Sequence, residues 1–138
     1  MRYAVVVAVV AAGCATQPGQ PVWTGWPMDS NTKAVSSLMA SARSDVAAGR
    51  LSNAAASMER ALRLAPRDAR LWQELARLRM KQGEFAQAEN VARRSNTLTR
   101  GDASLRLQNW QIIADSRDAR GDAEGARSAR ELAKRIEY

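Results

Sequence analysis

Few residues of this chain could perform chemistry. Cysteine occurs once, at Cys14, and histidine is absent. The missing imidazole excludes Ser–His and Cys–His nucleophiles and every metal site that relies on histidine. Asp115 and Asp118 could form a carboxylate pair, but charged residues at this helical spacing are usually a solvated face. We therefore expect no catalytic residue, no metal and no cofactor, and a protein that works by binding.

The single cysteine ends a short apolar run. Arg2 gives a positively charged start, and the residues from Tyr3 to Ala12 are all apolar or small. This run is about half of the ~20 residues that span a bilayer, and it has the length of a signal-peptide core. An ordinary secretory signal cut near the same residues would leave Cys14 as a free thiol.

The segment Ala11-Ala12-Gly13-Cys14 resembles the bacterial lipobox, in which small residues precede a cysteine that is lipidated on sulfur. Ala11 stands where the lipobox usually has leucine. The resemblance implies a lipoprotein signal peptide over residues 1–13 and a mature chain that begins at Cys14, which carries palmitate or another fatty acid. Ala15 follows in place of aspartate, which implies transport to the outer membrane and a protein that faces the periplasm.

Residues 14–33 follow as the lipidated cysteine and a tether. The stretch ATQPGQPVWTGWPMDSNT has three prolines, two glycines and no helical period, which is typical of a linker. Trp23 and Trp26 could dock onto the folded domain, a partner or the membrane interface. They could equally be incidental aromatics of a flexible segment.

The formal charge is +7, and nearly every cation is arginine. A basic surface suits nucleic acid, anionic lipid or an acidic protein segment. Export would separate the chain from nucleic acid, and the basic-aromatic patches of single-strand binders are missing. We therefore expect a protein partner and no nucleic acid, with the membrane reached only through the lipid anchor.

From residue 34 to 138 the apolar pattern is helical and repeats after 34 residues and then after 38. We expect a core that includes Trp72, Leu75 and Ala76, with Trp110 in the slot of Trp72. Predicted helices cover 34–48, 52–65, 69–82, 85–98, 104–120 and 123–136. Asp68 and Asp122 suit N-caps, and glycines stand at the turns (Gly49, Gly83 and Gly121). The extra four residues of the third unit should lengthen its first helix or the turn before it.

The period and its alanine, glycine, aromatic and proline positions resemble the tetratricopeptide repeat. The resemblance implies an all-α fold, with three helix-turn-helix repeats stacked as a short right-handed solenoid over residues 34–138. It also implies a concave surface, lined by the first helix of each pair, that binds a protein. The residues carried over onto that surface are Met39, Arg43, Arg70, Gln73, Arg77, Lys81, Gln111 and Asp115. Arg43 and Arg77 occupy the same slot in successive repeats, so we expect them to lie side by side and bind carboxylates.

The stretch from Val35 to Arg130 also resembles the LpoP-type outer-membrane lipoproteins, which activate a bifunctional class A penicillin-binding protein from across the periplasm. The resemblance implies a regulator of peptidoglycan synthesis rather than an enzyme. Two other classes stay open at the level of sequence. One is an adaptor in outer-membrane or secretion-machinery assembly, and the other is a structural wall-associated protein.

The lipidation hypothesis has a direct test. Cys14→Ser removes the sulfur that would carry the lipid, so an unprocessed precursor should accumulate and labelling by a radioactive fatty acid should disappear. The measurement is fatty-acid labelling and precursor size in cells that express each form. A wild-type chain that takes up no label would refute the anchor.

Overall fold

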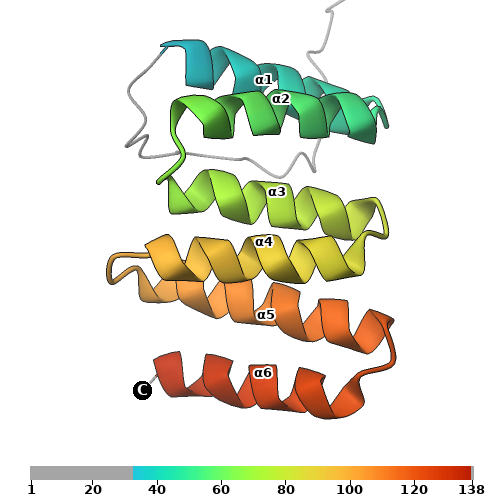
Figure 1. The fold of residues 1–138 in the computed structure, drawn as a ribbon, viewed down its shortest axis with the longest axis vertical. Coiled ribbons are helices and arrows are strands. Elements are labelled where there is room, and N and C mark those ends of the chain that lie inside the picture. The colour runs from blue at the N-terminus through green and yellow to red at the C-terminus, as the bar shows by residue number, and fades with distance from the viewer. Residues whose placement is uncertain (1–32, 138) are drawn as a thin grey trace, which may run out of the picture.

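The structure, a computed structural model, describes residues 33–137, without the side chain of Glu137. Cys14, Trp23 and Trp26 lie outside the described residues. The described part is helical: α1 (Lys33–Ala47), α2 (Leu51–Leu64), α3 (Ala69–Lys81), α4 (Phe85–Leu98), α5 (Ala103–Ala119) and α6 (Ala123–Glu137). Each helix end agrees with its predicted position to within one residue. Figure 1 shows the helices stacked as successive antiparallel pairs, which confirms the predicted all-α fold of helix-turn-helix units.

The first helix of each pair ends in the same way. Gly49, Gly83 and Gly121 have positive φ angles of 74°, 75° and 80°, a conformation that glycine adopts without steric cost. After Gly83, the amide of Glu84 donates to the carbonyl of Arg79 at 2.9 Å. This backbone bond closes the helix and turns the chain toward its partner helix. The three predicted turn glycines are therefore confirmed.

Aspartates begin the helices where they were predicted. Asp68 Oδ1 accepts from the amides of Arg70 and Leu71 at 2.9 and 3.3 Å, and Asp122 Oδ1 accepts from the amide of Gly125 at 2.9 Å. Asp102, which we did not predict as a cap, accepts from the amide of Leu105 at 2.9 Å. Each carboxylate satisfies helix amides that lack an intrahelical acceptor.

The four extra residues of the third unit lie inside its first helix. Asp68 and Asp102 cap α3 and α5 and are one 34-residue period apart, whereas the glycines that end these helices, Gly83 and Gly121, differ by 38. The whole difference therefore falls between cap and glycine, and α5 has 17 residues where α3 has 13. This outcome confirms the prediction that the extra residues lengthen the first helix of the third unit, rather than the turn before it.

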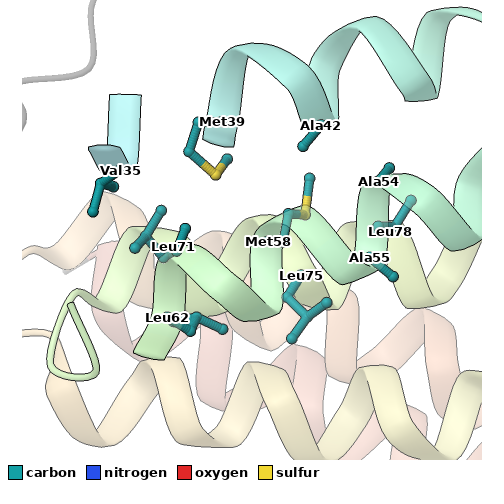
Figure 2. Packing of buried hydrophobic residues seen from close by; sticks show 11 residues of the cluster. Val35, Met39, Ala42, Ala54, Ala55, Met58, Leu62, Leu71, Leu75 and Leu78 are labelled. Carbon is teal, nitrogen blue, oxygen red and sulfur yellow. The ribbon is translucent and has the colours of Figure 1, made fainter. Parts of the chain in front are cut away.

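The buried apolar residues form two clusters that meet at α3. The first cluster joins α1, α2 and α3 and includes Met39, Met58 and Leu71; Figure 2 shows Leu71 beside Val35 of α1. The second joins α3 to α4, α5 and α6 through Ala76, Ala92 and Ile113, among others. Leu75, which was predicted as core, belongs to the first cluster. Because α3 contributes to both clusters, the hairpins share one continuous interior.

Trp72 is less buried than predicted. Its ring packs against the first cluster and remains partly exposed. The indole Nε1 donates to the Pro66 carbonyl at 2.9 Å, and the guanidinium of Arg94 lies 5.9 Å from the ring centroid. The neighbouring Leu71, at 1% exposure, is the residue that fills the interior. A tryptophan is suited to the edge of the core, because its indole N–H needs a polar partner.

A buried carboxylate joins the second repeat to the third. Glu89 of α4 is 7% exposed, and its Oε1 accepts from Arg93 and from Arg117 Nε, each at 2.9 Å. Arg120 binds the other oxygen. Burial by itself would raise the pKa of Glu89, but the hydrogen bonds from Arg93 and Arg117 outweigh it and lower the pKa below its ordinary value. The ionised carboxylate is therefore the form that stabilises the fold.

Replacing Glu89 with glutamine should test this junction. The amide would place a donor against arginine donors, so we expect the free energy of unfolding at pH 7 to fall by about 1.5–3 kcal/mol. A lowered folded pKa gives stability that is present above the unfolded pKa and lost as pH falls through the folded pKa. The deficit of Glu89→Gln should therefore shrink below about pH 4.5 in urea titrations. Asp115→Asn, a change at an exposed acid, is the control and should change stability by less than about 0.5 kcal/mol.

Candidate protein-binding face

The candidate face is formed by α1, α3 and α5, the first helix of each pair, and we call it the first-helix face. All eight predicted binding residues lie on these helices. Four of them are exposed: Arg43, Lys81, Gln111 and Asp115. Arg70 and Arg77 are half-buried. This set of six is accessible to a partner.

The other two predicted binding residues are buried. Met39 is 1% exposed and belongs to the first core cluster. Gln73 is 5% exposed, and its Nε2 donates to the carbonyl of Leu105 on α5 at 3.4 Å. Neither side chain can meet a partner, so their predicted role is wrong. Both side chains lie on the inward side of their helices, α1 and α3, where the neighbouring helices cover them.

Two arginines of α3, Arg70 and Arg77, are held by residues on α5 or just before it. Arg70 Nη2 lies 3.1 Å from Asp102 Oδ2. Arg77 Nη2 donates to Gln108 Oε1 at 2.6 Å. These bonds fix the orientation of both guanidinium groups, and each group keeps part of its surface in solvent, with 41% and 35% of the side chain exposed. A held and accessible guanidinium is suited to forked binding of carboxylates.

The bonds also correct the register that we expected between the second and third repeats. A shift of 38 residues would have placed Arg77 against Asp115. The structure places Arg77 against Gln108, 31 residues further along the chain. The longer α5 accounts for four of these seven residues, because its additional residues follow the N-terminal part that packs beside α3, and the other three are about one helical turn.

Glu74 is a residue of this face that the sequence analysis missed. Its Oε1 lies 3.9 Å from Arg77 Nη1, and only 17% of its side chain is exposed. Burial raises the pKa of Glu74 above its ordinary value, while the charges of Arg77 and Arg43 lower it to a smaller extent. The carboxylate thus stands in the field of both arginines, and an acidic partner would compete with it for them. Glu74 lies three residues before Arg77, a spacing at which opposite charges pair on a helix, and this spacing could have identified it from the sequence.

The described residues offer little other chemistry. Between residues 33 and 137 no group of three or more cysteine, aspartate or glutamate side chains is placed to hold a metal ion. Within the same range no helix is both long and apolar enough to cross a membrane. The first-helix face is thus a surface of mixed charge on which the predicted cations, Arg43, Arg70, Arg77 and Lys81, are accessible.

Comparison with known proteins agrees with this architecture. The family described as tetratricopeptide repeat matches residues 45–107, so the fold and the match together define a tetratricopeptide-repeat protein. The solved globular C-terminal domain of P. aeruginosa LpoP is 41% identical, with a TM-score of 0.71, over 75% of this chain and 97% of that one. The chain therefore belongs to the LpoP family of tetratricopeptide-repeat proteins. Among curated proteins, none matches.

The raised pKa of Glu74 predicts a stability effect opposite to that of Glu89. An acid whose pKa is raised on folding favours the fold below its unfolded pKa, and this contribution is lost as pH rises through the folded pKa. Glu74→Gln should therefore unfold no more easily than the parent at pH 7, and any gain in stability should vanish below about pH 4. Urea titrations at both pH values measure this. A clear loss of stability at pH 7 would show that the ion pair with Arg77 outweighs desolvation.

Proposed function

We propose that the protein is an outer-membrane lipoprotein that is anchored through Cys14, faces the periplasm, and binds and activates a bifunctional class A penicillin-binding protein. The observation that carries the proposal is the 41% identity to the LpoP domain across 97% of its length. The resemblance to LpoP-type lipoproteins implies the activation, and the resemblance of residues 11–14 to the lipobox implies the anchor.

The proposed contact is the first-helix face. Its centre is the row Arg43–Glu74–Arg77, in which one desolvated carboxylate lies in the field of two arginines. The nearest ion-pair distance, 3.9 Å from Glu74 to Arg77, is long, and short charge-assisted hydrogen bonds to a partner would be stronger. An acidic segment of the synthase would therefore compete with Glu74 for Arg77, in the field of the exposed Arg43. Lys81, one helical turn beyond Arg77, adds a further exposed cation.

Activation then requires no catalytic group on this chain. The lipoprotein needs only to bind the active state of the synthase better than the inactive state. A preference of ~1–3 kcal/mol gives roughly 5- to 150-fold coupling between binding and activity. The bonds from Arg70 to Asp102 and from Arg77 to Gln108 support such a preference, because side chains already held in place lose less entropy on binding.

Two variants with opposite effects on the charge of the face test the proposed contact. Arg43→Gln with Arg77→Gln removes two cations, and we expect the synthase to bind about tenfold more weakly or worse. Glu74→Gln removes the competing carboxylate and should strengthen binding. Arg60→Gln with Arg127→Gln is the matched control, since both are exposed arginines, on α2 and α6, and their loss should leave binding unchanged. The measurements are affinity and the glycan-polymerising rate of a purified cognate class A synthase, with each form of the chain added.

The outcomes separate the function from the face. If the wild-type chain neither binds such a synthase nor changes its rate, the activator function is refuted. If it activates, and all the variants activate equally well, the function stands and the first-helix face is not the contact.

A further inference from the structure

A second candidate surface lies where the chain passes from one repeat to the next. The α2–α3 and α4–α5 connections lie on the same edge of the stack (Figure 1) and together enclose an open basin of about 690 Å³. It is lined by Ala65–Arg70 from the first connection and by Leu98–Arg100, Asp102 and Leu105 from the second. We call this the loop basin. Its volume is within the range of about 300–1,000 Å³ that is usual for ligand sites.

The two acids of the loop basin are already engaged. Asp68 accepts the backbone amides that begin α3. Asp102 accepts the amide of Leu105 with one oxygen and pairs with Arg70 through the other. Each carboxylate is thus held by the fold, and neither pairs with Arg67 or Arg100.

Two cations of the loop basin are unpaired. Arg67 and Arg100 are exposed and line the basin from its two connections, and within residues 33–137 neither makes a hydrogen bond or an ion pair. Helix dipoles do not offset this charge, because the C-terminal ends of α2 and α4 meet the N-terminal ends of α3 and α5 at this edge. The arginine side chains therefore determine the sign of the electrostatic potential in the basin. This potential is positive, so the basin attracts anions.

Apart from these charged residues and Thr99, the lining is aliphatic. Pro66 is exposed and Ala65 and Leu98 are partly exposed, whereas Ala69 and Leu105, at 9% and 7% exposure, are buried beneath them. A small inorganic anion would use only the arginines and leave this apolar surface in water. Among the described residues no aromatic side chain lines the basin, and without one the lining offers no platform on which nucleic-acid bases could stack. A peptide that carries both carboxylates and aliphatic side chains matches both parts of the lining.

We infer that the loop basin binds a segment of a protein partner in which acidic residues flank an aliphatic one. Arg67 and Arg100 would bind the carboxylates from opposite sides, and the aliphatic side chain would cover Pro66 and Leu98. This site goes beyond the proposed function, because it requires neither the first-helix face nor a synthase. Arg70 alone belongs to both surfaces.

The test uses the purified full chain and a fluorescein-labelled peptide of alternating glutamate and leucine, followed by fluorescence anisotropy. Arg67→Gln with Arg100→Gln should weaken binding about tenfold or more, because two charge-assisted contacts are lost. The matched control is Arg60→Gln with Arg127→Gln, which removes the same charge at exposed arginines outside the basin. It should leave the affinity within about twofold, since charges far from the site are screened by salt. A glutamate–glycine peptide should bind more weakly than the leucine peptide.

Each other result overturns the inference. If the peptide does not bind, or the control pair weakens it as much as the basin pair, there is no acidic-peptide site at this edge. If oligothymidylate or inorganic phosphate competes as well as the peptide, the basin recognises charge alone. The assay contains no synthase, so its result is independent of whether the chain activates one.

Discussion

The structure depends on the burial of α3 from two sides. Leu71 and Leu75 of this helix pack into the first core cluster, and Ala76 belongs to the second. One helical hairpin cannot cover both of these surfaces, so the first and third hairpins must stack against the second. Small residues allow the close approach: Ala76 and Ala92 are fully buried, and an alanine at a helix crossing brings the two backbones together.

Apolar burial drives the stacking, but it is not directional, and polar groups set the register between the second and third repeats. The hydroxyl of Ser95 donates to the carbonyl of Ala69 at 2.7 Å, and Asn109 Nδ2 donates to Ser95 Oγ at 2.8 Å. Both side chains are fully buried, where an unpaired polar group would be costly. These bonds hold α3, α4 and α5 in the alignment that places Arg77 beside Gln108.

The arginines divide into groups with different roles. Those around Glu89 serve stability: Arg93 binds it within α4, and Arg117 and Arg120 join α4 to the C-terminal end of α5. Those of the first-helix face are oriented by neighbours yet remain accessible, which suits recognition of an acidic partner. Arg67 and Arg100 of the loop basin have no partner in the described part of the chain. A formal charge of +7 is thus not spread evenly, and the pairing of each arginine indicates which surface is available for binding.

The sequence by itself determined the helices and their ends, because these depend on neighbours within a few residues. The aspartate caps and the turn glycines are local signals, and Asp102 could have been found from its 34-residue distance to Asp68. The tertiary structure alone decided which side chains of the first helices reach the surface. Met39 and Gln73 are buried, and Glu74 is desolvated, because helices distant in sequence cover them. The four additional residues in α5 changed the alignment of the repeats. The repeat pattern in the sequence does not show where in the unit such residues are placed, because their position depends on how the helices pack.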